Sequence, residues 1–496
     1  MAKKIISEPS RTLMEYRLLP GLTKKDMHPK KISLKTPLVY HPNQDKYMIN
    51  FPIVSAAMQS VSGDKMGIEM AKLGSVAFIF ASQPIWSQAE MITKIKNYKA
   101  GFVKPKTALG NMTIKELYKI RKQTGFSTFP VVDENGYFIG LITKYDYDID
   151  LHGDYTVAQR MIPKNQIKFG VNISNLKEAN KMLLESHKSV LPILNGEGKL
   201  ISMVFRKDIF QYKEHPFEVT DDKKRLFAVA AINTHDYKDR VKALVDAEVD
   251  VLAIDSSDGY TEYQKETIQW IKKNYPDIPV IGGNIITRKG FRYLVDAGVS
   301  AVKIGMGGGS ICITQEQKGT GRGLATTIID VVKEREKYFK ETGKYIPIVA
   351  DGGVTSTKDI TIALALGADY VMMGRYFARM EESPTEKIVV NNRVMKPYWG
   401  EGSARARQWL QNRYNQSKFV EGVEGFVEYA GRLQDNIEET LMKIKAAMST
   451  CAARNIEEFH KNAVLELVSA LSIREGKPHD ILLHSEKNDS NENYDL

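Results

Sequence analysis

The sequence predicts an α/β protein whose largest part is a (β/α)8 TIM barrel, interrupted after its second strand by a smaller module. Eight short apolar segments have the length and composition of buried strands, and amphipathic helical segments lie between them. Strands that alternate with helices in this way form a parallel sheet. The eight segments are residues 51–58, 75–80, 227–233, 251–255, 280–284, 301–305, 346–351 and 370–374.

The ends of these segments predict a functional site. Six of the segments finish on a polar residue or a glycine, namely Asn233, Asp255, Asn284, Gly305, Asp351 and Gly374. Packing gives no reason to place such residues at one end of each strand. Barrel enzymes, in contrast, build their active sites from the carboxyl ends of the strands.

The stretch between the second and third strands repeats itself. Proline, glycine and aspartate recur 62 residues apart, at Pro130 and Pro192, Gly136 and Gly198, and Asp146 and Asp208. Repetition predicts a paired module, in which the glycine closes a hairpin turn and the aspartate caps the next helix. The two units resemble tandem CBS domains, which often bind adenine or guanine nucleotides. A spacer that binds nothing is the alternative.

Composition limits the classes of function. The chain has 496 residues, a net charge of +10 and two cysteines, Cys312 and Cys451. Its lysines and arginines are dispersed rather than gathered in a stripe with aromatic residues, so nucleic acid is not the favoured partner. Two cysteines cannot build a disulfide framework, which fits a reducing cytoplasm. We expect neither a membrane span nor a signal peptide, because no apolar run has the required pattern.

The segment from Lys303 to Thr314 is the strongest chemical signal. A buried strand leads into a glycine-rich loop, and the loop delivers Cys312. Glycines let a backbone approach a ligand closely, and exposed backbone N–H groups suit a phosphate. A small buried residue in a turn is the alternative reading of Cys312. Further on, Asp351 suits a ribose diol, and Gly353, Gly374 and Arg375 suit a phosphate. Together these groups predict covalent chemistry on a nucleotide base.

The sequence resembles the IMP dehydrogenase family and its relatives, the GMP reductases. The resemblance rests on the cysteine loop, the Asp351-Gly352-Gly353 motif, the Asp255-Ser256-Ser257 motif and the inserted module. Arg375 places it nearer to microbial members than to animal ones. The resemblance implies that Cys312 attacks C2 of IMP and that hydride passes to NAD⁺. Hydrolysis of the covalent intermediate then gives XMP, on the route to guanine nucleotides.

The resemblance also implies roles for individual residues. Substrate-binding residues would be Ser310, Gly353, Gly374, Arg375 and Tyr398 for the phosphate, Asp351 for the ribose, Glu401, Gly402 and Glu421 for the purine, and Asn284 near the reacting ring. Cofactor-binding residues would be Asp255, Ser256, Ser257, Gly305, His235 and Tyr263.

An insertion after the last strand, residues 383–430, resembles the mobile flap of that family. Its Arg413-Tyr414 pair matches the hydrolytic dyad, in which the arginine activates water; a surface salt bridge is the alternative for Arg413. Thr314 would position the water and relay its proton, and Glu421 is the alternative base.

The cysteine loop would also hold K⁺, through carbonyls of Gly307, Gly309 and Cys312. A neighbouring subunit of a homotetramer would add Glu475, Gly476 and Lys477, the last of which stands where the family has glycine. The predicted division is a first barrel part at 1–100, the CBS pair at 101–215, a second barrel part at 216–480 and a disordered tail at 481–496. Two other functions stay open, a GMP reductase and a non-enzymatic CBS nucleotide sensor.

Overall fold

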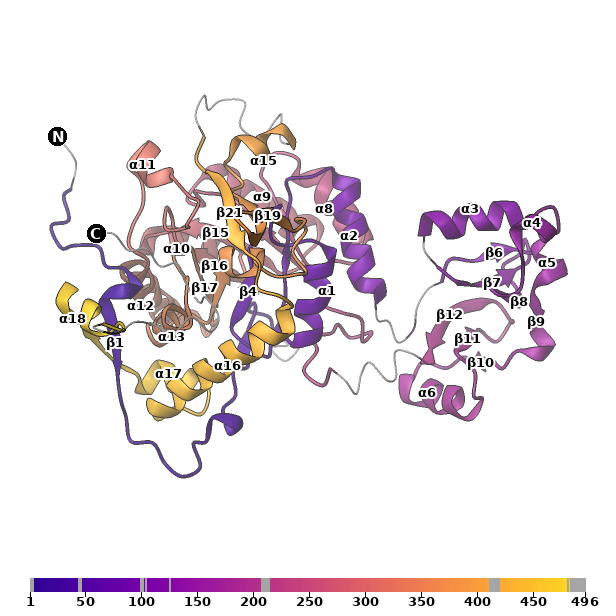
Figure 1. The fold of residues 1–496 in the computed structure, drawn as a ribbon, viewed down its shortest axis with the longest axis horizontal. Coiled ribbons are helices and arrows are strands. Elements are labelled where there is room, and N and C mark those ends of the chain that lie inside the picture. The colour runs from indigo at the N-terminus through magenta and orange to yellow at the C-terminus, as the bar shows by residue number, and fades with distance from the viewer. Residues whose placement is uncertain are drawn as a thin grey trace.

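The computed structural model describes residues 4–42, 47–98, 102, 105–124, 126–206, 215–409, 420–479 and 481. Eight parallel strands form a barrel in the order β4-β18-β17-β16-β15-β14-β13-β5, and a parallel bridge between Ser55 and Ala77 joins the two ends of this sheet. The strands are β4 Ile53–Ser55, β5 Phe78–Ile79, β13 Val229–Ile232, β14 Val251–Ile254, β15 Val280–Ile285, β16 Ala301–Ile304, β17 Ile348–Asp351 and β18 Tyr370–Met373. The predicted barrel is confirmed, strand by strand (Figure 1).

Helices surround the barrel and pack their buried residues against it. They are α1 Asp64–Leu73, α2 Ile85–Tyr98, α8 Tyr237–Asp246, α9 Glu262–Asn274, α10 Arg288–Ala297, α12 Leu324–Thr342, α13 Thr357–Ala365 and α16 Leu433–Thr450. In α10, Phe291, Leu294 and Val295 lie three to four residues apart and are buried together. Thr287 caps its first turn by accepting from the Gly290 N–H, and Gly298 ends it with a φ of +106°.

Segments outside the barrel repeat complete the larger lobe in Figure 1. β1 Tyr16–Leu19 pairs antiparallel with β22 Val464–Leu467, so the two distant ends of the described chain are joined. The remaining elements here are the 3-10 helices Leu13–Glu15 and Pro29–Lys31, β2 Thr36–Pro37, β3 Met48–Ile49, α11 Thr314–Lys318, α14 Arg375–Ala378, α17 Ile456–Asn462 and α18 Ala470–Glu475.

The inserted stretch forms two small sheets in a separate lobe (Figure 1). One sheet contains β6 Ala108–Leu109, β7 Thr128–Val132, β8 Phe138–Thr143 and β9 Ile162–Pro163, and the other contains β10 Gly170–Val171, β11 Val190–Leu194 and β12 Leu200–Phe205. Among the described residues, the lobe also contains the helices α3 Ile114–Thr124, α4 Ile149–His152, α5 Val157–Arg160 and α6 Leu176–Glu185 and the 3-10 helix Lys164–Gln166.

The repeat is visible in the two hairpins of this lobe. Gly136 and Gly198 close the turns with φ of +83° and +89°, as the sequence predicts. The predicted cap by Asp146 is wrong: its carboxylate accepts from the Thr143 N–H at 2.5 Å, and Asp148 caps α4 instead. Asp208 lies outside the described residues.

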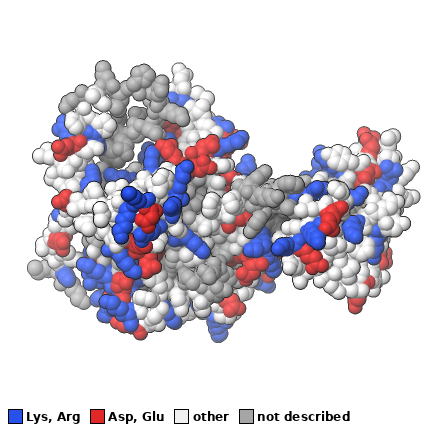
Figure 2. Space-filling model, turned by 90° about the horizontal axis from the view of Figure 1, so that it is seen from below, with Lys and Arg blue, Asp and Glu red and all other residues white. Residues whose placement is uncertain are grey.

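A three-stranded antiparallel sheet occupies the insertion after the last barrel strand. It contains β19 Ile388–Val390, β20 Arg393–Trp399 and β21 Glu424–Glu428, and α15 Ala404–Trp409 follows β20. In the described chain, no helix is both long and apolar enough to cross a membrane. On the face that Figure 2 shows, basic and acidic side chains are interspersed. The predicted tail, apart from residue 481, lies outside the described residues.

Candidate active site

A cavity of about 240 Å³ opens at the carboxyl ends of the barrel strands. Loops that follow β14, β15, β16, β17 and β18 line it, and so do the turn after β20 and the segment before β21. Five of the six predicted strand ends therefore meet in one place, at the end of the barrel where the fold predicts a site, whereas Asn233 does not line the cavity.

Close backbone contacts fix the cysteine loop at the floor of this cavity. Gly305 has a φ of +121°, and a Cβ there would lie 2.0 Å from the Asp351 carbonyl oxygen, so only glycine fits. Two hydrogen bonds then tie the loop to the segment before β21. The Ile313 N–H donates to the Glu421 carbonyl at 3.1 Å, and the Val423 N–H donates to the Ile311 carbonyl at 3.0 Å.

A chain of three polar side chains begins at the cysteine. Cys312 is half-buried, and its Sγ lies 3.2 Å from the Thr314 hydroxyl. That hydroxyl donates to Glu421 Oε2 at 3.3 Å, and Lys318 Nζ lies 2.7 Å from Glu421 Oε1. A nucleophile, a hydroxyl and a carboxylate thus lie in sequence, as a proton relay requires.

Two carboxylates share a buried lysine on the opposite wall. Lys303 Nζ lies 3.1 Å from Asp351 Oδ2 and 3.7 Å from Asp255 Oδ1. Lys303 follows Ala301 by two positions in β16, so both side chains face the barrel interior. Asn284 also donates to Asp351 Oδ2, at 2.9 Å, and its own Oδ1 is buried with no hydrogen-bond partner among the described residues. A buried acceptor without a partner is costly, so this atom suits a donor on a ligand.

The third wall carries the groups predicted for a phosphate. Gly353, with a φ of +74°, and Gly374 bring backbone to the cavity, and Arg375 brings a guanidinium. The Tyr398 hydroxyl covers Gly374, where a Cβ would lie 2.7 Å from it. Burial raises the pKa of Tyr398 to about 12, against the opposing hydrogen bond to Ser310, so the phenol stays a neutral donor.

Gln59 holds the turn after β20 in place. Its backbone N–H donates to Glu401 Oε1 at 2.7 Å, and its side-chain Oε1 accepts from Trp399 Nε1 at 2.9 Å. Its Nε2 donates to the Ser82 carbonyl at 2.8 Å. The turn after β20 is therefore fastened to the loops after the first two barrel strands.

Comparisons with known proteins agree with this geometry. The sequence model described as "IMP dehydrogenase / GMP reductase domain" matches residues 10–479. An inosine-5'-monophosphate dehydrogenase of Tritrichomonas foetus is 47% identical over 98% of this chain and 99% of its own length.

The chain belongs to the IMP dehydrogenase / GMP reductase family.

Other relatives support the same family membership. An inosine-5'-monophosphate dehydrogenase of Aquifex aeolicus is 36% identical, over 88% of this chain and 90% of its own. A crystal structure of a GMP reductase variant from Trypanosoma brucei, in complex with guanosine 5'-monophosphate, matches with a TM-score of 0.86 at 25% identity. That match covers 96% of this chain and 99% of the other.

The cavity brings together most of the residues that the family resemblance suggested. The predicted residues that line it are Asp255, Ser256, Ser257, Asn284, Gly305, Gly307, Gly309, Ser310, Cys312, Thr314, Asp351, Gly353, Gly374, Arg375, Tyr398, Glu401, Gly402 and Glu421. Five predicted residues do not line it: His235, Tyr263, Glu475, Gly476 and Lys477. Arg413 and Tyr414 lie outside the described residues.

Those five residues all lie on the surface of the protein, outside the cavity. His235 and Tyr263 are both exposed, after β13 and at the start of α9. Glu475 ends α18, and Gly476 and Lys477 follow it on the surface. At the predicted cation ligands, the Gly307 carbonyl accepts from Gln315 Nε2 at 2.9 Å, and the Gly309 carbonyl accepts from the Cys312 N–H at 3.0 Å.

Sequence reasoning missed two members of the site, Lys303 and Lys318. Lys303 had a visible signal, because a lysine inside the apolar strand 301–304 must face the interior at the site end. Lys318 had a weaker one, its position one helical turn after Thr314. Its contact with Glu421, about a hundred residues away, appears only in the fold.

Proposed function

We propose that this protein is an IMP dehydrogenase that oxidises IMP to XMP with NAD⁺. The observation that carries the proposal is the series Cys312, Thr314 and Glu421 beside a nucleotide-sized cavity. A nucleophile alone would serve several reactions. A nucleophile with a hydroxyl and a carboxylate behind it can move the proton when water hydrolyses a covalent intermediate. The relative that is 47% identical over 98% of this chain is an inosine-5'-monophosphate dehydrogenase, which favours that reaction.

IMP would lie with its phosphate between Gly353, Gly374, Arg375, Ser310 and Tyr398. Asp351, which accepts hydrogen bonds only, would take the ribose hydroxyls. The turn at Glu401 and Gly402 would face the purine, and Asn284 Oδ1 would accept from a donor of the bound ligand. This placement brings C2 of the base towards Cys312.

The reaction divides into two halves. In the first half the thiolate of Cys312 bonds to C2, and the hydrogen at C2 leaves as hydride, which NAD⁺ accepts. Asp255 would hold the nicotinamide ribose, with Ser256, Ser257 and Gly305 beside it, and His235 and Tyr263 would lie further out along the adenosine. In the second half water adds to C2, the carbon–sulfur bond breaks, and XMP leaves.

The remaining assignments rest on the family resemblance. Arg413 and Tyr414 would form the dyad that activates water after NADH leaves. The carbonyls of Gly307, Gly309 and Cys312, with Glu475, Gly476 and Lys477 of a neighbouring subunit, would hold K⁺ and help to keep the loop in its working shape. The assembly would be a homotetramer, and residues 101–215 would form a CBS pair that binds a regulatory adenine or guanine nucleotide.

Two parallel assays test the proposed reaction. Purified protein receives IMP with NAD⁺ in one and GMP with NADPH in the other, and absorbance of the reduced cofactor is followed. We expect a rise with IMP and no fall with GMP. Acid quenching during turnover should also trap a protein whose intact mass has increased by one nucleotide.

GMP reductase is the second candidate, because a GMP reductase structure matches nearly the whole chain. A fall in absorbance with GMP and NADPH, together with silence in the IMP assay, would establish it. No change in absorbance in either assay would favour a nucleotide sensor. Calorimetric titration of AMP, ATP and GTP into the whole protein would then test whether it binds these nucleotides.

A further inference from the structure

The short helix α11 presents two polar side chains to one carboxylate. Thr314 and Lys318 are its first and last residues and lie one turn apart. The Thr314 hydroxyl donates to Glu421 Oε2 at 3.3 Å, while Lys318 Nζ lies 2.7 Å from Glu421 Oε1. The two partners therefore divide the carboxylate between them, one oxygen each.

The burial of the Glu421 carboxylate makes its ion pair with Lys318 important. The Glu421 side chain is only 8% exposed, whereas that of Lys318 is 37% exposed. A buried carboxylate without a counter-charge tends to take up a proton. Among the described residues, the ion pair of Glu421 is with Lys318. On the neighbouring elements, Cys312 and the exposed Glu316 carry no positive charge, Glu401 points Oε1 at the Gln59 N–H, and the exposed Arg405 lies over the Trp399 ring at 4.1 Å.

We propose that Lys318 is a positioning residue for the hydrolytic half-reaction. It holds Glu421 by Oε1, so that Oε2 stays turned to the Thr314 hydroxyl. This inference rests on the proposed function, because it assigns a role within that reaction.

Following the protons through the relay shows why Glu421 must be able to accept a proton on Oε2. As water oxygen bonds to C2, one water proton passes to the Thr314 oxygen, and the Thr314 hydroxyl proton passes to Glu421 Oε2. Glu421 ends the step neutral beside the Lys318 ammonium and releases its proton to solvent. A carboxyl that already carries a proton on Oε2 cannot accept another, so the relay needs Oε2 free and turned to Thr314.

The test uses the whole protein with Arg413→Gln, which removes the other base that the resemblance suggests. Lys318→Met and Lys318→Arg are compared in that background with Lys344→Met, an exposed lysine in the loop before β17. Rapid mixing with IMP and NAD⁺ separates the NADH burst, which reports hydride transfer, from steady turnover, which reports hydrolysis. Both are measured from pH 5.5 to 9.

We expect Lys318→Met to keep its burst while hydrolysis at pH 7 slows about ten-fold, somewhat less than the usual contribution of a general base. The acid limb of the hydrolysis profile should move up by about one pH unit or more. Lys318→Arg should restore the limb, and Lys344→Met should not move it. In a background that also carries Glu421→Gln, Lys318→Met should have no further effect on hydrolysis, since the proton acceptor is then absent.

Three outcomes separate the possibilities. A profile of Lys318→Met that coincides with that of Lys344→Met overturns the positioning role while the enzyme still turns over. Loss of the burst together with hydrolysis would show that Lys318 supports the fold of the loop rather than the relay. Absence of any NADH formation from IMP by the unmodified protein would instead refute the proposed function itself.

Discussion

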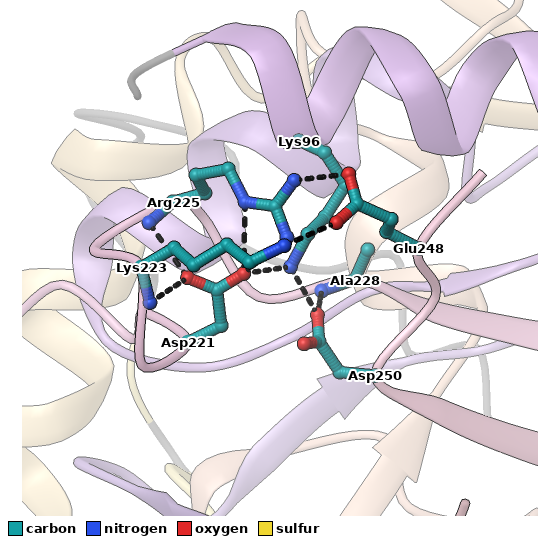
Figure 3. Close-up of polar contacts among 7 residues, drawn as sticks. All are labelled: Lys96, Asp221, Lys223, Arg225, Ala228, Glu248 and Asp250. Atoms are coloured by element: carbon teal, nitrogen blue, oxygen red, sulfur yellow. Dashed lines mark hydrogen bonds and ion pairs between the residues drawn. The ribbon is translucent and has the colours of Figure 1, made fainter. Parts of the chain in front are cut away.

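The two ends of the barrel both contain buried charges, but they use them differently. At the carboxyl end, Lys303 lies between two carboxylates that also face a cavity, and Asn284 Oδ1 has no partner among the described residues. At the amino end, Figure 3 shows a cluster in which Lys96 reaches both Asp221 and Asp250, at 2.8 Å and 2.7 Å. The first arrangement is left open to a ligand, and the second is closed on itself.

The closed cluster is held by further contacts. Arg225 forms ion pairs with Asp221 and with Glu248, and the Ala228 N–H donates to Asp250 (Figure 3). Asp250 lies directly before β14, and Ala228 directly before β13. The comparison teaches that position along the strand separates the two arrangements: charges at the strand starts are paired with one another, and charges at the strand ends line the cavity, where barrel enzymes have their active sites.

The largest effect that the comparison predicts is at Cys312. Replacing Cys312 with alanine should lower NADH formation by about a thousand-fold or more, because the nucleophile is lost. The free energy of unfolding should change by less than about 1 kcal/mol, since a half-buried side chain loses one atom. Stopped-flow absorbance and urea unfolding measure the two quantities. Substantial residual turnover would remove Cys312 from the mechanism.

The next largest effect is on stability: replacing Lys96 should lower the free energy of unfolding while catalytic activity is retained. Lys96→Met leaves Asp221 and Asp250 buried without their shared cation, which should cost about 3–5 kcal/mol of unfolding free energy. Lys94→Met, on the same helix but 52% exposed, is the matched control and should cost less than about 1 kcal/mol.

Tryptophan fluorescence suits this measurement, because all four tryptophans lie outside residues 101–215 and report the rest of the chain. The kcat of folded Lys96→Met should stay within about two-fold of the parent. A strong drop in kcat at full stability would show that the two ends are coupled.

The smallest effect is a pH dependence at the closed cluster. Burial, opposed by Lys96, raises the pKa of Asp250 to about 6, while Asp221 keeps a lowered pKa despite its burial because Lys96 and Arg225 face it. A carboxyl with a raised pKa in the folded state stabilises the fold most below its unfolded pKa of about 4, and loses that contribution as the pH rises to about 6.

The stability difference between the parent and Asp250→Asn should therefore fall between about pH 4 and pH 6, by on the order of 2 kcal/mol, and stay level above about pH 7. Urea unfolding at pH 4.5, 6 and 7.5 checks this. A stability difference that grows between pH 4 and pH 6 would mean that the ion pair with Lys96 keeps Asp250 ionised over that range.

Local patterns in the sequence were enough to predict the barrel, its polar strand ends and the cysteine loop, and the family resemblance added further residues that line the cavity, such as Tyr398, Glu401 and Glu421. The apolar segments, their polar ends and the cysteine loop are each continuous in sequence, so periodicity and spacing reveal them. Contacts between distant segments were not predictable in this way. The Lys318–Glu421 pair and the cluster of Lys96, Asp221 and Asp250 exist only because the barrel closes. Asp146 failed as a cap because Asp148, two residues on, is the residue that α4 uses.

The contact between Lys96 and Asp221 has a consequence for how the chain could have acquired its inserted lobe. The whole insertion lies between these two residues, yet their charged groups are 2.8 Å apart. A long excursion costs little extra closure entropy when its two ends are already fastened to each other. The strand order of the barrel therefore does not depend on the lobe. A linker of a few residues in place of the lobe would leave the circular arrangement of strands unbroken.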